Sequence, residues 1–227
     1  MCVKYKRIIC GCIVVALLCV SRIWYVNHLD IVNQYRTKRQ IYPAGEEVAL
    51  QDAMYHIDVA DLKGYYVKVT DVKVVQTADF LEQYGMDMKK LEAMTDSESG
   101  AYDTFGLLCL VTAEFHNEQW DSGEEQYVLL DNFLMVGDDY WINPATDTIN
   151  RIAGVNPELD GASSFCIQSE RTFEVTIPYL IPSKGEKAFS VADLKKSDPK
   201  LLLMAYPEEN FLQLPEITNV EKDSTKG

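Results

Sequence analysis

The side chains that could support chemistry in this chain are three histidines, six cysteines and a large surplus of carboxylates. His28, His56 and His116 lie far apart, and no H-E-x-x-H or H-x-H spacing places two of them on one face of an element. The sequence also lacks a G-x-S-x-G nucleophile elbow, a phosphate loop and a G-x-G-x-x-G dinucleotide fingerprint. This pattern predicts no metal, no cofactor and no enzymatic activity.

Only two cysteines, Cys109 and Cys166, lie beyond the N-terminal apolar segment. In an oxidising compartment they would form one disulfide, whereas otherwise they would be two buried thiols, and the sequence leaves both alternatives open. A nucleophile–base pair with His116 is disfavoured, because Cys109 lies in the strongly apolar run at residues 105–115, where a thiol stays protonated and inert.

Acidic residues are the remaining enrichment. Asp138 and Asp139 lie in a tight turn, and Asp147 lies in a long polar loop. Loop carboxylates can assemble a calcium site outside the cell, but the D-x-D-x-D-G spacing is absent. A solvated acidic surface is therefore the favoured interpretation.

Aromatic residues follow the same turn, at Tyr140 and Trp141. Such side chains can form a binding patch, but we expect them to close one end of the core instead. If a partner binds, the sequence favours residues 143–162 with Trp141 at the root of this loop, because long loops on a rigid scaffold often carry function. The candidate binding residues are Trp141, Asp138, Asp139 and Asp147.

The N-terminal residues predict a membrane anchor. Residues 8–26 are mostly apolar and carry no charge apart from Arg22, and a membrane helix needs roughly 17–25 apolar residues to cross about 30 Å of hydrocarbon. Lys4, Lys6 and Arg7 precede the segment, so the positive-inside rule places residues 1–7 in the cytoplasm. A cleaved signal peptide and a lipoprotein signal are the alternatives, but the small residues that both require are poorly placed.

The rest of the chain is strongly acidic. Four of the 21 Lys and Arg lie within residues 1–26, so the remaining 201 residues carry 17 against all 35 Asp and Glu, a net charge of −18. Without a basic stripe, this charge argues against nucleic acid as a partner. The length suits one domain with its own core.

The periodicity beyond a stalk at residues 27–40 is mainly that of β-strands. Residues 65–75 alternate with one change of phase, which predicts a bulged strand, and residues 78–94 show a helical period that predicts one or two short helices. Residues 105–115 predict a central strand covered on both faces. Further strands are expected at 126–136, 140–142, 164–179, 200–206 and 210–214, a turn or short helix at 190–196, and a frayed tail at 216–227.

Several landmarks carry a family resemblance across residues 42–214. They are Tyr42-Pro43, Gly45-Glu46, the strand 67–74, Phe80-Leu81, Tyr84-Gly85, the run 107–115 with His116-Asn117, 173–178, 201–207 and 211–214. This pattern resembles a family of anchored or lipid-attached extracytoplasmic domains of unknown function from Gram-positive bacteria, with an immunoglobulin-like (telokin-like) β-sandwich. The resemblance implies a fold and a location at the cell envelope, but no catalytic residues.

The sequence therefore predicts a single-pass membrane protein with a mainly β, immunoglobulin-like sandwich at residues 41–215 outside the cell. Its expected role is a binding or structural module for an envelope protein or peptide, in addition to the membrane contact of its helix. The alternatives are the extracytoplasmic part of a carboxylate-dependent hydrolase and an accessory or sensor subunit of a membrane complex. The oligomeric state is left open.

Overall fold

The computed structural model describes residues 38–50, 62, 64–94, 102–118, 127–152, 154–185, 188–204 and 208–219, together with 18, 20–22 and 24. The chain divides into two compact units, Met1–Lys38 and Arg39–Gly227. Most of the predicted membrane segment at residues 8–26 lies outside the described residues, although the described ones among them are helical. Within the described part of the chain, no helix is long and apolar enough to span a membrane.

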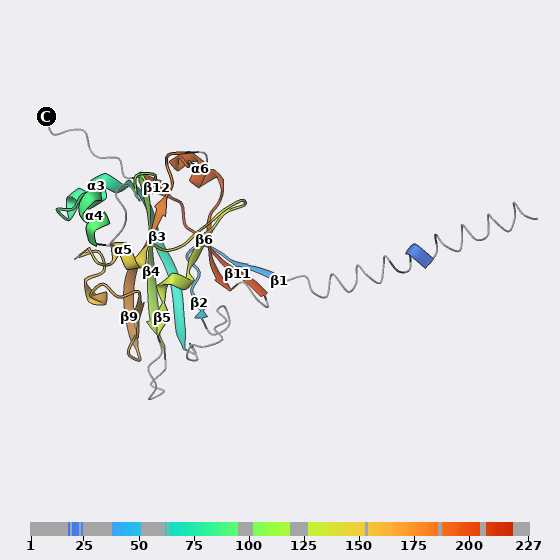
Figure 1. Cartoon of the computed structure of the whole chain (residues 1–227). Helices are drawn as coiled ribbons and strands as arrows, with labels where there is room; N and C mark the ends of the chain where they lie inside the picture. Colours follow the sequence, from blue (N-terminus) through green and yellow to red (C-terminus); the bar gives the residue numbers. More distant parts are fainter. Residues whose placement is uncertain are drawn as a thin grey trace, which may run out of the picture. The chain divides into compact units, whose positions relative to one another are not determined.

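The second unit is built on a central sheet whose strand order is β12-β3-β4-β9 (Figure 1). Its long strands are antiparallel: β3 (Tyr65–Gln76), β4 (Leu107–Asn117) and β9 (Arg171–Ile181). The predicted bulge in β3 is confirmed, because the register with β4 shifts between Val69 and Asp71. Two short strands complete the sheet by pairing with β3: β2 (Val48–Ala49), antiparallel, and β12 (Thr218–Asn219), parallel.

The second sheet has the order β1-β11-β10-β6-β7. Its strands are β1 (Lys38–Tyr42), β6 (Leu134–Val136), β7 (Trp141–Ile142), β10 (Lys200–Met204) and β11 (Glu208–Gln213). β6 and β7 form the hairpin that the sequence predicted, and β10 and β11 form another antiparallel pair. A small separate pair joins β5 (Val128–Leu129) to β8 (Ser164–Phe165).

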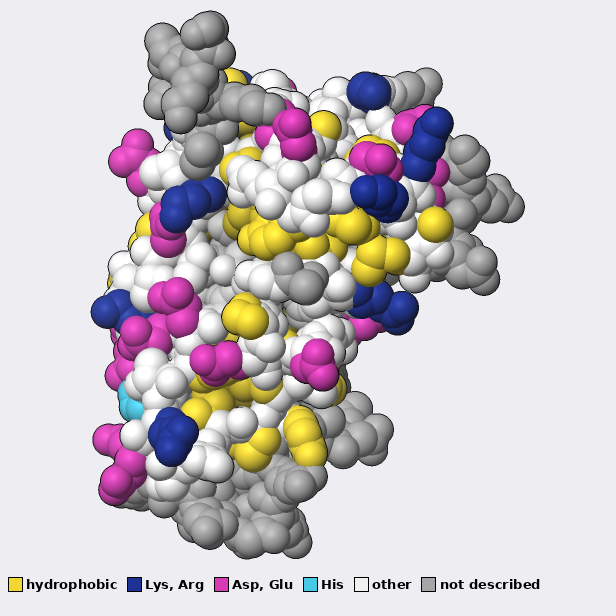
Figure 2. Space-filling view, turned by 90° about the vertical axis from the view of Figure 1, so that its left-hand side faces the viewer, with side chains coloured by type: hydrophobic (Ala, Val, Ile, Leu, Met, Phe, Trp, Pro, Cys, Tyr) yellow, Lys and Arg dark blue, Asp and Glu magenta, His cyan; other side chains and the backbone are white. Residues whose placement is uncertain are grey.

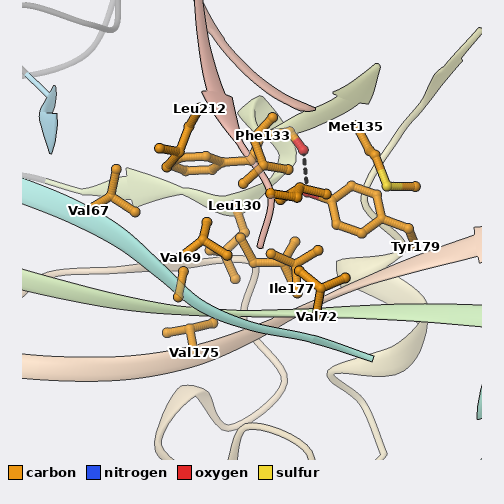
Figure 3. Close-up of a cluster of buried hydrophobic side chains, with 14 of the residues drawn as sticks. Val67, Val69, Val72, Leu130, Phe133, Met135, Val175, Ile177, Tyr179 and Leu212 are labelled. Atoms are coloured by element: carbon orange, nitrogen blue, oxygen red, sulfur yellow. Dashed lines mark hydrogen bonds between the residues drawn. The ribbon is translucent and has the colours of Figure 1, made fainter. Parts of the chain in front are cut away.

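Alternation along the strands places one face of each sheet in a shared core. Val67, Val69 and Val72 of β3 belong to the same buried cluster as Met135 of β6 and Leu212 of β11 (Figure 3). Burial of such apolar side chains stabilises the fold by about 25 cal/mol per Å² of apolar surface. The two sheets therefore form two packed layers, and the prediction of a mainly β domain is confirmed.

Helices cover the other face of the central sheet at one end only (Figure 1). They are α3 (Thr77–Gln83), α4 (Met88–Met94) and α5 (Thr146–Ile149). Phe80, Leu81, Leu91 and Ile149 pack there in a second buried cluster that also contains Leu108 of β4 and Leu180 of β9. The helical period at residues 78–94 thus predicted α3 and α4 correctly.

Two predicted strands are broken. The expected strand at 126–136 is interrupted by the 3-10 turn η1 (Leu130–Asn132), and 164–179 is split into β8 and β9. Pro178 was expected to end a strand but lies inside β9. Proline fits there because β9 is an edge strand and the backbone nitrogen of residue 178 faces away from β4, so no hydrogen bond of the sheet is lost.

The predicted boundaries need two smaller corrections. The stalk was expected to reach residue 40, but β1 begins at Lys38. The tail was expected to fray from residue 216, but Ile217 is buried and Thr218 donates a hydrogen bond to the Val72 carbonyl oxygen at 3.1 Å. Residues 220–227 lie outside the described residues.

Candidate functional site

A cleft among the described residues lies between the β6–β7 hairpin and α6 (Val191–Lys196). We call it the Trp141 cleft; its volume is about 690 Å³. Its lining is mainly apolar and carries a few charged groups: Asp138, Asp139, Tyr140, Trp141, Ile142, Pro182, Ala188, Phe189, Asp193, Lys196 and Ser197. A cleft of this size, apolar with few polar groups, is typical of a binding site.

The hairpin turn is shaped by local packing. The Gly137 N–H donates to the Tyr140 carbonyl oxygen at 3.0 Å, which closes the turn. A Cβ atom at Gly137 would lie 2.3 Å from the Tyr140 ring, so a side chain at this position would displace the ring. Glycine therefore allows the turn to fold tightly against the tyrosine that forms one wall of the cleft.

Tyr140 is held from two sides. Its ring makes an edge contact with Phe189 at 4.8 Å between centroids, and its hydroxyl lies 2.7 Å from the Ser197 Oγ. Burial raises the pKa of the Tyr140 hydroxyl above its usual value of 10.0. This wall is thus rigid and uncharged, and the expectation that Tyr140 closes an end of the core is confirmed.

Trp141 behaves in the opposite way. Its side chain is 74 % exposed, so the expectation that it also fills the core was wrong. Successive residues of a strand point to opposite faces, and Trp141 pairs with Val136 on the outer face of the second sheet. It also borders a second groove of about 450 Å³, which includes Ile41 and Phe211.

The charges around the Trp141 cleft are mostly negative. Asp138 and Asp139 are exposed at the turn, and Asp193 and Lys196 lie three residues apart on α6 and both line the cleft. Hydrogen bonds from the Ser190 hydroxyl and backbone N–H lower the pKa of Asp193, so this carboxylate is charged at neutral pH. Three carboxylates against one ammonium group favour a positively charged ligand.

Of the residues predicted from the sequence, Asp138, Asp139 and Trp141 come together, but Asp147 does not. Asp147 is exposed on α5, which packs against β9, and it does not line the cleft. The favoured loop at 143–162 is likewise separate from the cleft lining, because Ala145 N–H donates to the Pro178 carbonyl oxygen and holds the loop along β9.

The sequence did not predict the residues that line the α6 side of the Trp141 cleft. Phe189, Asp193 and Ser197 carried no functional signal in the sequence, although Ser190 and Asp193 have the spacing of a capping box and form one in the structure. That spacing could have fixed the start of α6, but not its position beside the hairpin.

Cys109 and Cys166 are both free, so no disulfide joins them, and only Cys109 is buried, so they are not two buried thiols either. The Cys166 Sγ lies 3.6 Å from the Tyr65 hydroxyl, and Tyr65 pairs with Asn117 at the end of β4. Asn117 is separated from Cys109 by roughly 27 Å along the strand, whereas a disulfide needs Cα atoms within about 7 Å. Burial raises the pKa of Cys109 to about 12.

His116 lies within β4. Its Nδ1 lies 2.7 Å from Glu47 Oε1, and its ring stacks on Tyr66 at 4.9 Å. His116 lies seven positions after Cys109, an odd number that places their side chains on opposite faces of the strand. No group of three or more His, Cys, Asp or Glu that could hold a metal ion occurs among the described residues.

Fold and site together define a mainly β domain with an apolar cleft rimmed by carboxylates. The chain belongs to the family described as Domain of unknown function (DUF5028), whose model matches residues 39–210. No curated protein and no solved structure matches the chain. The family membership agrees with the resemblance to domains of unknown function and identifies no activity.

Proposed function

We propose that this chain is a membrane-anchored, extracytoplasmic binding module whose Trp141 cleft holds an apolar, positively charged segment of an envelope partner. The observation that carries the proposal is the 74 % exposure of Trp141 at the rim of an apolar cleft. Tryptophan is enriched among the residues that dominate binding energy, since a single side chain removes a large apolar area from water on binding.

The charge of the cleft supports this choice of partner. A Lys or Arg side chain beside Asp138, Asp139 and Asp193 would gain favourable electrostatic energy and speed association. Anionic lipid headgroups would instead be repelled by these carboxylates and by the acidic remainder of the chain, whose net charge is −18.

The location at the envelope is part of the same proposal. It is supported by the apolar residues 8–26 and by Lys4, Lys6 and Arg7 before them. Protease added to intact cells should digest the second unit, Arg39–Gly227. Digestion only after the cells are permeabilised would contradict the proposed orientation.

We further infer that the two packed sheets are an immunoglobulin-like sandwich of a Gram-positive envelope protein. The support is the antiparallel β3, β4 and β9 packed through one core against β6, β10 and β11. An experimental structure whose strand order does not superpose on an immunoglobulin domain would exclude this identity.

Photo-cross-linking tests the binding site directly. A photoreactive amino acid at position 141 of the full-length chain, in its native membranes, should give one discrete adduct. The same group at position 147, which is exposed but outside the cleft, is the matched control. The adduct should decrease when Asp138 and Asp139 are both changed to Asn. Equal adducts from positions 141 and 147, or none from 141, would contradict the proposed function.

A further inference from the structure

β9 lies at the edge of the central sheet and pairs with β4 from Arg171 to Ile181. In an antiparallel pair, every second residue directs its N–H and C=O away from the neighbouring strand. Thr176 is such a residue, because its N–H donates to Asn156 Oδ1 at 2.9 Å and its carbonyl oxygen accepts from Asn156 Nδ2 at 2.8 Å. The period of two assigns the same outward direction to Thr172, Glu174 and Pro178.

The C-terminal half of this edge is closed. The Asn156 side chain satisfies both backbone groups of Thr176, in the way that a neighbouring strand would. At Pro178 the carbonyl oxygen accepts from the Ala145 N–H at 2.7 Å, and proline has no N–H to satisfy. Natural proteins commonly cover a sheet edge with such loops and prolines, because an open edge invites another strand.

The N-terminal half of the edge is open. The outward N–H and C=O groups of Thr172 and Glu174 make no hydrogen bond with any residue that the structure describes. Both side chains are also exposed. Two residues therefore present four backbone groups that a further strand could pair with.

A groove of about 320 Å³ accompanies this open edge. It is lined by Val155, Asn156, Pro157, Glu158, Thr172, Phe173, Glu174 and Thr176. The only charged residues in this lining are Glu158 and Glu174. Figure 2 faces the side on which β9 lies in Figure 1, and several Asp and Glu side chains gather there.

We propose that a short, extended and basic peptide segment of a partner adds to β9 as a further strand at Thr172–Glu174. Backbone hydrogen bonds would supply affinity, and a Lys or Arg beside Glu158 and Glu174 would supply specificity. A second copy of this chain fits less well, since two β9 edges would bring the same carboxylates together. Asn156 ends the open edge at Thr176 and so limits the added strand to a few residues.

Hydrogen exchange measured by NMR on the full-length chain tests the free edge. The Thr172 and Glu174 amides should exchange fast, while the Phe173 and Val175 amides, which face β4, should exchange slowly. Thr176 should be protected, and Asn156→Ala should remove that protection. Slow exchange at both Thr172 and Glu174 in the free protein would overturn the proposal.

Selection from a random peptide library displayed on phage then identifies the ligand class. We expect enrichment of peptides with a basic residue, and binding that falls at least tenfold in Glu174→Pro, which removes an outward N–H but no bond to β4. The matched variant Glu174→Gln keeps that N–H and should lose only the preference for basic residues. Trp141→Ala should leave these peptides bound, which separates this site from the Trp141 cleft.

A second readout guards against a folding defect in Glu174→Pro. Adding a selected peptide to the unmodified chain should slow exchange at Thr172 and Glu174. Peptides that bind Glu174→Pro as tightly, that leave these two amides unprotected, or that show no basic enrichment would each overturn the proposal.

Discussion

The two ends of the central sheet differ in how many faces they bury. At one end, Leu107–Val111 of β4 and Ile177–Ile181 of β9 lie between the core and the layer of α3, α4 and α5, and nearly every residue there is buried. At the other end, Thr112, Glu114 and His116 alternate with buried residues, because helices cover only the first end. The two ends of the same strands thus meet different surroundings.

One end of the sheet therefore contributes most to the stability of the fold, whereas the other end exposes groups that a partner could bind. The doubly covered end holds buried hydrogen bonds such as that from the Tyr179 hydroxyl to the Phe133 carbonyl oxygen at 2.6 Å. The singly covered end offers backbone groups and charged side chains to solvent, including Glu174 on the open edge. Addition of a partner strand to β9 is expected at the second end, because the outward backbone groups of Thr172 and Glu174 are exposed there.

The largest change in the free energy of unfolding is expected when a buried side chain at the doubly covered end is shortened. Ile177→Ala at the doubly covered end should lower the free energy of unfolding by about 2–5 kcal/mol, because it leaves a cavity in the core. Thr172→Ala, on the same strand at the other end, should change it by at most about 0.5 kcal/mol. Urea unfolding measures both, and similar values for the two variants would break the distinction.

A smaller loss of unfolding free energy is expected at the edge of β9, where the Asn156 side chain pairs with the backbone of Thr176. Asn156→Ala should cost about 1–3 kcal/mol, since it removes the partners of the Thr176 N–H and C=O and of the Asn150 Oδ1. Asn156→Asp keeps an acceptor for the N–H but turns a second acceptor oxygen towards the Thr176 carbonyl oxygen and Asn150 Oδ1, so it should not restore the lost stability. If thermal unfolding shows no difference between the alanine variant and the parent, Asn156 does not close the edge.

The pH dependence of stability should reveal the buried thiol. The pKa of Cys109 rises from 9.0 unfolded to about 12 folded, so the folded state binds more protons at intermediate pH. Its contribution is complete below pH 9 and is lost as the pH rises towards 12. The urea midpoint should fall between about pH 8 and pH 10, and this fall should be smaller in Cys109→Ala than in the parent. Cys166→Ala removes an exposed thiol and is the matched control; equal falls in Cys109→Ala and the parent would contradict burial.

The smallest change in the free energy of unfolding is expected at the singly covered end of the sheet, on the face that no helix covers. In the parent, His116 Nδ1 lies 2.7 Å from Glu47 Oε1, and both side chains are partly exposed. His116→Gln removes this contact and should lower the free energy of unfolding by at most about 1 kcal/mol. Salt titration of the unfolding free energy should show little change for this variant relative to the parent. A loss as large as that of Ile177→Ala would mean that this face is held as firmly as the covered end.

The sequence predicted local features of the site better than its assembly. Asp138, Asp139 and Trp141 were expected together, because one tight turn brings them within a few residues. Asp147 was grouped with them only by its place in the following loop, and the structure puts it on α5. The apolar run at 105–115 was expected to be covered on both faces, but only its first half is, since polar residues alternate from Thr112 onwards.

By itself, the sequence determined the elements that arise from short-range patterns: the bulged strand β3, the helices α3 and α4, the β6–β7 turn and the acidic surface. Period and turn chemistry act over a few residues, so they can be read directly. Only the tertiary structure decided that Tyr140 packs while Trp141 stays exposed, that Asn156 closes one half of the β9 edge, and that Cys109 and Cys166 lie apart. Those outcomes depend on contacts between residues distant in the chain, which no local pattern encodes.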